Sequence, residues 1–277
     1  MGQEATSQIP RSLPDLKGFA FDLDGTIWEG TTLLPGAATL VADMRSAGLG
    51  VVFASNCSRH GSSILCRQLA DLGIHASPTE VVTPFDLVGE AIRRRLGPVR
   101  TLVIGTDDLA EVLASSGHAR VPVEQWQDAQ AVVVGVDHDF SYERLRAAAR
   151  AVASGAAFFA VNLDASFPVG QGQIDPGCGA LAEAIAVAGR ARPVAIGKPE
   201  PPLFQFAIER LQCQPHEAAM VGDSLSSDIA GGRAAGMYTI WINASGQASS
   251  ANHADLTIQS LSELHQIWLR TRDVVIR

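Results

Sequence analysis

Short apolar segments alternate with helical segments along most of this 277-residue chain. An apolar segment that opens at Gly18 is followed by a helical segment over 37–47, and a second apolar segment covers 49–54. Another helix is predicted over 62–72. Strands that alternate with helices across short connections are typical of parallel sheets. The chain is therefore expected to adopt an α/β fold built on a doubly wound parallel sheet.

The same alternation predicts how the chain divides into domains. The middle block has enough predicted strands and helices for an α/β core of its own, and it contains a Gly- and Pro-rich loop over 167–179. The last third resumes the pattern with a strand over 194–196, which we assign to the outer segments. Further strands are predicted at 101–104, 131–136, 157–161, 218–221, 238–242 and 256–258. We predict a flexible tail over 1–14. The core is expected to consist of two outer segments, 15–82 and 193–277, and a smaller α/β domain is expected to be inserted between them over 83–192.

Composition excludes several classes of protein. The net charge of −8 argues against binding to a nucleic-acid backbone, which requires clustered Lys and Arg. The four cysteines have no CxxC spacing, so neither a zinc site nor a disulfide framework is indicated. No apolar run approaches the length of about 20 residues that spans a bilayer, and the N-terminal residues lack the pattern of a signal peptide. We therefore expect a cytoplasmic protein without a membrane or nucleic-acid partner.

The first apolar strand ends in two carboxylates, Asp22 and Asp24, followed by Gly25 and Thr26. Two nearby carboxylates repel each other, and partial burial adds a desolvation cost. One interpretation is a solvated strand end with a turn at Asp24-Gly25. The other is a pair of acids that surround a cation or a reacting group. This segment taken alone favours the first interpretation.

The residues at other strand ends favour the second interpretation of Asp22 and Asp24. Polar groups also follow three later strands, because Ser55-Asn56, Gly197-Lys198 and Asp223 each come directly after an apolar run. Each has an ordinary alternative when taken singly: a turn hydroxyl for Ser55, a solvated side chain for Lys198. Asp228, five residues after Asp223, would by itself be a favourable charge at a helix start. The chain has 21 basic residues, and only two of them are Lys, which suggests that Lys198 is retained for its compact ammonium.

Together these groups predict a site for a phosphoryl group and a hard cation. In doubly wound sheets the ligand binds beyond the carboxyl ends of the strands. Carboxylate oxygens suit Mg²⁺, which takes one or two carboxylates together with substrate oxygens and water. A hydroxyl, an ammonium and backbone N–H groups can bind phosphoryl oxygens, and a carboxylate can also act as a nucleophile.

At this point the chain resembles a haloacid dehalogenase (HAD) superfamily phosphatase over residues 16–270. The run Asp22-Leu23-Asp24-Gly25-Thr26 matches the first motif of that superfamily. Ser55 matches the second motif, Lys198 in Gly-Lys-Pro the third, and the segment from Gly222 to Asp228 the fourth. The insertion between the second and third motifs, with the segments 55–59 and 176–181, resembles the NagD-like, type IIA (C2-capped) subgroup. The resemblance implies a Rossmann-like core with an inserted α/β cap.

The resemblance also implies a role for each motif residue. Asp22 would attack phosphorus and form an aspartyl-phosphate, and Asp24 would protonate the leaving oxygen and later deprotonate water. Mg²⁺ would be bound by Asp22, the backbone carbonyl of Asp24, and Asp223, and Asp228 would position Lys198 or a metal-bound water. The phosphoryl oxygens would be bound by Ser55, Asn56 and Lys198.

Substrate choice is expected to depend on the cap, where the sequence departs from the subgroup pattern. Asn162-Leu163-Asp164 stands where Asn-Pro-Asp is usual, and Cys178 replaces a common Thr or Ala. Cys57 stands where Asn is usual, either as a small packing residue or as a thiol near the site. The candidates for substrate contact are Asp164, Phe167 and Cys178. Because caps of related phosphatases often carry a dimer surface, the resemblance also suggests a homodimer formed through the cap.

Three functions remain open at this stage. The first is Mg²⁺-dependent hydrolysis of a small phosphomonoester, such as a sugar phosphate, glycerol phosphate or phosphoglycolate. The second is a phosphotransferase or mutase on the same fold, although Asp24 as a general base favours water as the acceptor. The third is a non-catalytic metabolite-binding protein, against which the complete motif set argues.

Overall fold

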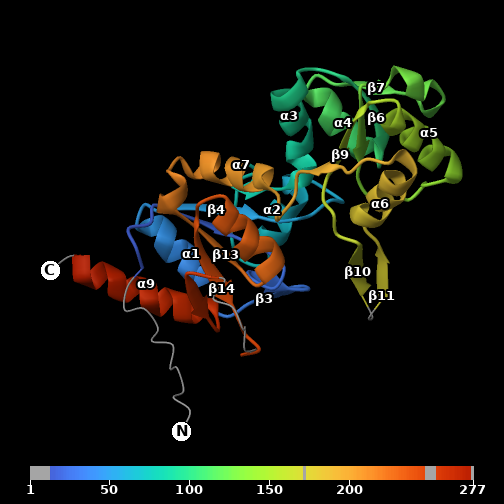
Figure 1. Ribbon diagram of the computed structural model, residues 1–277. Coiled ribbons are helices and arrows are strands. Elements are labelled where there is room, and N and C mark those ends of the chain that lie inside the picture. Colours follow the sequence, from blue (N-terminus) through green and yellow to red (C-terminus); the bar gives the residue numbers. More distant parts are fainter. Residues whose placement is uncertain (1–12, 171–172, 247–253, 276–277) are drawn as a thin grey trace, which may run out of the picture. The chain divides into compact units, whose positions relative to one another are not determined.

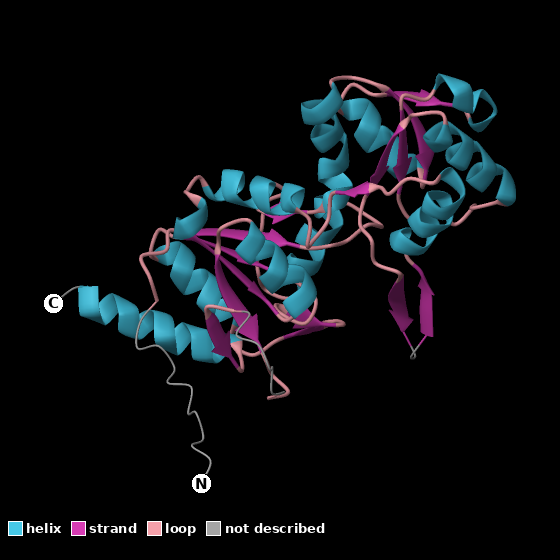
Figure 2. Cartoon of the chain, in the orientation of Figure 1, coloured by secondary structure: helices cyan, strands magenta, loops and turns pink. Residues whose placement is uncertain are grey.

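A computed structural model describes residues 13–170, 173–246 and 254–275. The chain forms two compact units. The first contains Met1–Ala54, Gln68–Val81 and Phe204–Arg277, and the second contains Ser55–Arg67 and Val82–Leu203. In each unit the main sheet lies between helices, and the β10–β11 hairpin extends away from them (Figures 1 and 2). Within the described residues, no helix combines the length and the apolar character that a membrane crossing needs.

The first unit is built on a six-stranded sheet in the order β15-β14-β13-β1-β4-β5. The central strand β1 pairs in parallel with β13 on one side and β4 on the other, so that Phe21 lies opposite both Val221 and Phe53. Strand order reverses beside β1, and this reversal is where doubly wound sheets bind ligands. The strands are β1 (Gly18–Phe21), β4 (Gly50–Ala54), β5 (Val81–Val82), β13 (Ala218–Gly222), β14 (Tyr238–Ile242) and β15 (Leu256–Ile258).

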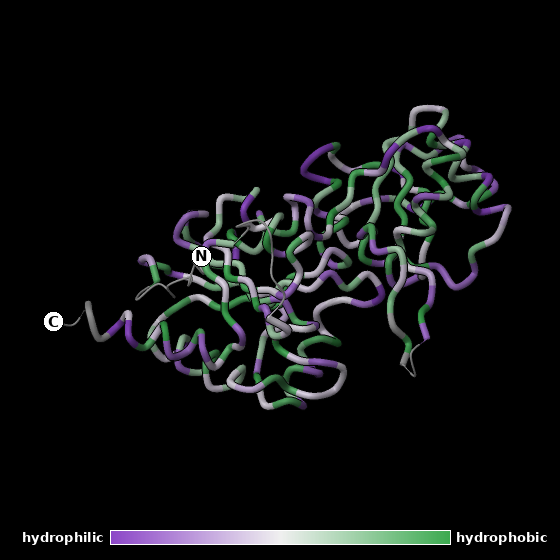
Figure 3. The backbone as a smooth tube through the Cα atoms, turned by 60° about the horizontal axis from the view of Figure 1, so that its bottom comes forward, coloured by the Kyte–Doolittle hydropathy of each residue, from purple (hydrophilic) through white to green (hydrophobic). Residues whose placement is uncertain are grey.

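Helices cover this sheet and bury its apolar side chains. Helix α1 contacts β4 and α9, and α9 contacts β15, whereas α8 contacts β14. Phe19, Phe21 and Phe53 are fully buried, and burial of such a side chain contributes about 1.5–3 kcal/mol. These helices are α1 (Ala37–Ser46), α8 (Ala230–Ala234) and α9 (Leu261–Val275), while α2 (Ser62–Asp71) and α7 (Pro201–Leu211) have residues in both units. Apolar stretches recur at short intervals along the described part of the chain (Figure 3), as the predicted strand pattern requires.

The second unit has its own five-stranded parallel sheet in the order β12-β9-β8-β6-β7. Thr83, Thr106 and Ser141 cap helices α3, α4 and α5, because each side-chain oxygen accepts a backbone N–H from the first turn. The strands are β6 (Arg100–Ile104), β7 (Ala119–Val121), β8 (Ala131–Val134), β9 (Ala157–Ala160) and β12 (Val194–Ala195). The helices are α3 (Pro84–Leu96), α4 (Asp107–Ser115), α5 (Tyr142–Ala153) and α6 (Cys178–Gly189), with a 3-10 turn at Val123–Asp128.

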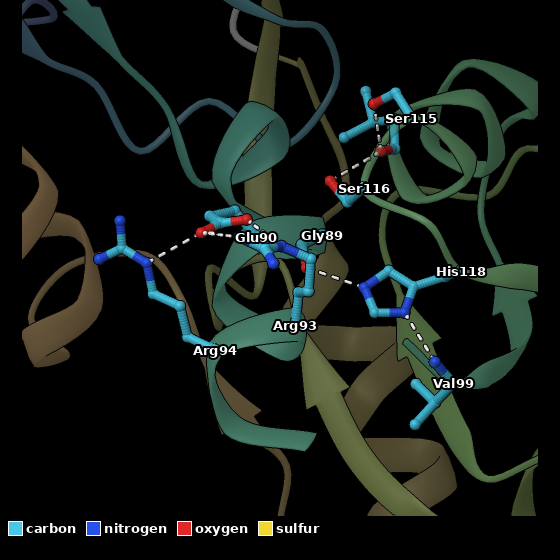
Figure 4. A network of polar contacts seen from close by, with 9 residues as sticks. Gly89, Glu90, Arg93, Arg94, Val99, Ser115, Ser116 and His118 are labelled. Atoms are coloured by element: carbon cyan, nitrogen blue, oxygen red, sulfur yellow. Dashed lines mark hydrogen bonds and ion pairs between the residues drawn. The ribbon is translucent and has the colours of Figure 1, made fainter. Parts of the chain in front are cut away.

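A buried histidine joins two layers of this second unit (Figure 4). The Val99 N–H donates to Nδ1 of His118 at 3.2 Å, so Nδ1 is an acceptor and the proton is on Nε2. Nε2–H then donates to the carbonyl of Gly89 in α3 at 2.8 Å. Both ring nitrogens are therefore used in holding α3 against the β6–β7 connection, which makes His118 a structural group.

The observed fold confirms the predicted α/β class and corrects several details. The predicted loop over 167–179 is an antiparallel hairpin of β10 (Ser166–Gly170) and β11 (Gln173–Pro176), and α6 begins directly after it. The strand that we assigned to the outer segments, β12, pairs instead with β9 in the sheet of the second unit. The short strands β2 (Trp28–Glu29), β3 (Thr32–Leu33), β5 and β7 were not predicted.

The N-terminal segment also differs in part from the prediction. Residues 1–12 of the predicted flexible tail lie outside the described residues. Leu13, near its end, is buried, and its backbone N–H donates to Thr271 Oγ1 at 2.9 Å. This residue is thus packed against α9. The other domain boundaries derived from the sequence, with the inserted domain at 83–192, stay a prediction.

Candidate active site

Three carboxylates come together in the first unit, at the strand-order reversal. Asp22 directly follows β1, and its backbone N–H donates to the carbonyl of Val221 in β13 at 2.9 Å. Asp223 directly follows β13, and Asp228 lies in the π-helical turn Leu225–Ile229. One carboxylate oxygen from each of the three lies within 4.8 Å of the others. The prediction that the ends of β1 and β13 carry one acidic cluster is therefore consistent with the geometry.

The local backbone explains how these acids come so close. Asp22 is 7% exposed and Asp228 is 1% exposed, whereas Asp223 is exposed. The Ser224 N–H donates to Asp228 Oδ2 at 3.1 Å, and this bond fixes that carboxylate inside its own turn. Gly25 has φ +80°, and a Cβ at this position would lie 2.7 Å from Cγ of Asp223. A residue with a side chain would be strained there and would collide with the acid, so the turn requires glycine.

The donor set fits a hard divalent cation. Three carboxylates that converge while two of them are buried would repel one another strongly unless a positive charge compensates. All of the converging atoms are oxygens, which are the ligands that Mg²⁺ prefers. The sequence predicted Asp22, Asp24 and Asp223 as metal ligands and Asp228 as a supporting residue. The cluster contains the carboxylates of Asp22 and Asp223, and that of Asp228 joins them; the predicted ligand from Asp24 is its backbone carbonyl, which stays a prediction.

Asp24 lies in a tight turn that follows β1. The backbone N–H groups of Ile27 and Trp28 both donate to the carbonyl of Leu23, at 2.8 and 3.0 Å. This turn carries the indole of Trp28 back to Asp24, where Nε1–H donates to Oδ1 at 2.9 Å. Asp24 is exposed and keeps one carboxylate oxygen outside that bond. Trp28 is a site residue that the sequence analysis missed, although its spacing of four residues from Asp24 is local.

The second unit contains the remaining motif residues. Ser55 is buried; its backbone N–H donates to the carbonyl of Val82 at 3.0 Å, and its hydroxyl oxygen accepts the Cys57 N–H at 3.2 Å. Lys198 is 4% exposed, an unusual environment for a lysine. It follows β12, which pairs with β9 in the sheet of the second unit, whereas the sequence assigned that strand to the outer segments.

The predicted phosphate ligand Asn56 and the predicted substrate contact Asp164 bind each other. Nδ2 of Asn56 lies 3.1 and 2.9 Å from the two carboxylate oxygens of Asp164, and it also approaches the carbonyl of Lys198 at 3.4 Å. Burial raises the pKa of Asp164, while the hydrogen bond from Asn56 and the charge of Lys198 oppose that shift. The Asn56 amide and the Asp164 carboxylate are thus hydrogen-bonded to each other in this structure.

The two other predicted cap residues have different surroundings. The ring of Phe167, in β10, lies 4.6 Å from Cζ of Arg59, a cation–π contact that the sequence analysis did not anticipate. Cys178 has no exposed surface, and its thiol donates to the carbonyl of Val134 at 3.1 Å. Burial raises the pKa of this thiol to about 11. The expectation that Cys178 contacts a substrate is therefore wrong for this structure, because the side chain belongs to the core of the second unit.

Comparison with known proteins covers both units. Residues 19–119 match the family described as haloacid dehalogenase-like hydrolase, and residues 195–264 match a HAD-hydrolase-like family. An acid sugar phosphatase of Staphylococcus haemolyticus is 30% identical over 83% of this chain and 86% of its own length. NagD from E. coli K-12 shares 27% identity, with a TM-score of 0.81 over 90% of this chain and 98% of that one. A p-nitrophenyl phosphatase from Archaeoglobus fulgidus shares 26%, with a TM-score of 0.81 over 91% and 99%.

Proposed function

We propose that this chain, which belongs to the haloacid dehalogenase-like hydrolases and is a NagD-like phosphatase, hydrolyses a small phosphomonoester. The proposed reaction requires Mg²⁺ and proceeds through an aspartyl-phosphate on Asp22. The observation that carries this proposal is the convergence of Asp22, Asp223 and Asp228 at the carboxyl ends of β1 and β13. Asp22 follows the central strand, which supports its assignment as the nucleophile.

The proposed reaction proceeds in two displacements. A carboxylate oxygen of Asp22 attacks phosphorus, the bond from phosphorus to the ester oxygen breaks, and Asp24 gives its proton to that departing oxygen. A water molecule then attacks phosphorus while Asp24 takes a proton from it. The bond to Asp22 breaks, so the carboxylate is restored and inorganic phosphate leaves. The exposed position of Asp24 and its hydrogen bond from Trp28 support this acid and base role.

The chain offers partners for the phosphoryl charge as well. Mg²⁺ would be held by Asp22, Asp223 and the carbonyl of Asp24, with Asp228 beside them, and when bound it would neutralise negative charge on the phosphoryl group. We propose that the hydroxyl of Ser55 and the ammonium of Lys198 bind phosphoryl oxygens. The motif positions of both residues and their burial support this assignment, since charge-assisted bonds are stronger away from water.

For the substrate we propose a phosphorylated metabolite of the size of a sugar phosphate, with glycerol phosphate and phosphoglycolate as further candidates. The relationship to an acid sugar phosphatase supports this class. Water is the proposed acceptor in preference to a sugar hydroxyl, because the role of general base that we propose for Asp24 favours water. The homodimer through the cap and the cytoplasmic location stay predictions of the sequence.

Phosphate release from p-nitrophenyl phosphate and from a panel of phosphorylated metabolites, with Mg²⁺ and with EDTA, tests the proposal. Asp22→Asn should abolish turnover, because an amide is neither a nucleophile of this kind nor a charged metal ligand. Asp71→Asn is the matched control, since Asp71 is exposed at the end of α2 in the same unit. Turnover by Asp22→Asn at the rate of the wild type and of the control would refute the assignment.

A further inference from the structure

Asn56, Asn162 and the exposed Asp164 form a polar network in the second unit, which we call the Asp164 network. Nδ2 of Asn162 donates to Asp164 Oδ2 at 2.8 Å and to the backbone carbonyl of Asn56 at 2.7 Å. Nδ2 of Asn56 donates to both carboxylate oxygens of Asp164. The backbone N–H of Asp164 completes the network by donating to Asn162 Oδ1 at 3.3 Å. One carboxylate therefore receives hydrogen bonds from two amides that lie more than 100 residues apart in the chain.

The network joins two segments that carry proposed phosphoryl ligands. Asn56 follows Ser55, and its Nδ2 also approaches the carbonyl of Lys198. Gly197, just before Lys198, donates its N–H to the carbonyl of Val161 at 2.9 Å. A Cβ on Gly197 would lie 3.0 Å from Cβ of Asn162 and 3.2 Å from Cγ of Asn56. The segment that carries Lys198 is thus packed directly on both amide side chains.

The orientation of the Asn56 amide depends on Asp164. Among the described residues, Asn56 Oδ1 is buried without a hydrogen-bond partner, so nothing at that end selects the amide orientation. At the other end, Nδ2 has three acceptor oxygens, and two of them belong to Asp164. If the carboxylate is removed, only the Lys198 carbonyl at 3.4 Å still favours this orientation, so the amide is held more weakly and rotates more easily.

We infer that Asp164 is a positioning residue, which fixes the Ser55-Asn56 segment relative to the Gly197-Lys198 segment and does not contact the substrate. This inference rests on the proposed roles of Ser55 and Lys198. Because the phosphoryl group is common to all substrates, loss of the network should reduce kcat/KM by the same factor for each of them. A residue that contacts the variable part of the substrate would instead change the order of preference among substrates.

Asp164→Asn and Asp164→Ala test this inference, with Asp128→Asn as the control because Asp128 is an exposed aspartate of the same unit. We expect kcat/KM to fall about 10- to 100-fold, equally for p-nitrophenyl phosphate and for metabolites with different leaving groups. Inhibition by inorganic phosphate should weaken in parallel. The Mg²⁺ concentration for half-maximal activity should not change, since the Asp164 network contains none of the three converging carboxylates.

A double-mutant cycle with Asn56→Ala separates the network from two independent effects. If Asn56 acts through Asp164, the double variant should lose no more activity than the more damaged single variant. Additive losses, an unchanged kcat/KM in Asp164→Asn, or a loss that differs between substrates would each overturn the inference.

Hydrogen exchange provides a readout that needs no turnover. The backbone amides of Cys57 and Gly197 should exchange faster in folded Asp164→Asn than in the wild type or in Asp128→Asn. An inactive wild-type protein would refute the proposed function, while this exchange result would still decide whether the network fixes the two segments. Unchanged exchange at both amides would overturn the inference.

Discussion

Replacement of Gly25 by alanine should damage the acidic cluster far more than it damages the fold. The residue has φ +80°, and alanine in that region costs about 1–2 kcal/mol of stability. The new Cβ would also lie 2.7 Å from Cγ of Asp223, whereas carbon atoms in contact prefer about 3.5–4.0 Å. The carboxylate must therefore move by about 1 Å. Because Asp223 is exposed, it can move without disturbing the core, so the main effect should fall on metal binding.

Gly48→Ala is the matched control for this substitution. Gly48 has φ +82° in the same unit, and a Cβ there would meet nothing within 4 Å. The two variants should thus lose similar stability in urea unfolding, while only Gly25→Ala should need more Mg²⁺ for half-maximal activity. Its kcat/KM should fall about 100-fold, the size of effect expected for a misplacement of about 1 Å. Equal activity and an equal Mg²⁺ requirement in the two variants would refute this account of the Gly25 turn.

Two further predictions concern buried groups in the two units. Asp228→Asn keeps the size of the side chain but removes one of three converging charges, so it should raise the Mg²⁺ concentration needed for half-maximal activity. A Mg²⁺ titration of activity checks this, and an unchanged titration would exclude a role of Asp228 in Mg²⁺ binding. Cys178 should resist alkylation in the folded protein at pH 8, because burial raises its pKa to about 11; peptide mapping after iodoacetamide treatment checks this. Between about pH 9 and pH 11 the folded state keeps the thiol proton while the unfolded state loses it, so the free energy of unfolding should fall as pH rises through this range. Cys178→Ala should lack that part of the pH dependence.

The acidic cluster was predictable because it follows from a general property of parallel sheets. Asp22 and Asp223 each come directly after an apolar strand, and neighbouring parallel strands end at the same edge. That rule needs no knowledge of distant contacts, and it identified both residues from local pattern alone. It also identified Asp228 as a nearby acid, but not that its carboxylate joins the cluster, because the π-helical turn that directs it inward has no clear local signature.

The rule assigned β12, the strand before Lys198, to the wrong sheet, because it assumes that the strands of the outer segments all belong to one sheet. Strand β12 has only two residues, and nothing in Val194-Ala195 indicates which of two parallel sheets it joins. The hairpin that follows Ala165 was missed for a related reason, since its Gly and Pro residues are typical of loops. Strand pairing over long sequence separations is decided by packing, and local composition does not specify it.

The same limit explains why Asp164 was first interpreted as a substrate contact. In the sequence it is a lone acid in a cap loop, and the surface is the ordinary place for such a residue. Its partner Asn56 lies 108 residues away, so no local pattern could join the two. Once they are joined, the hydrogen bonds that hold the carboxylate use both of its oxygens. A charge held in this way is better suited to fixing the two proposed phosphoryl-binding segments than to selecting among substrates, and for that reason the equal loss across substrates is the decisive measurement.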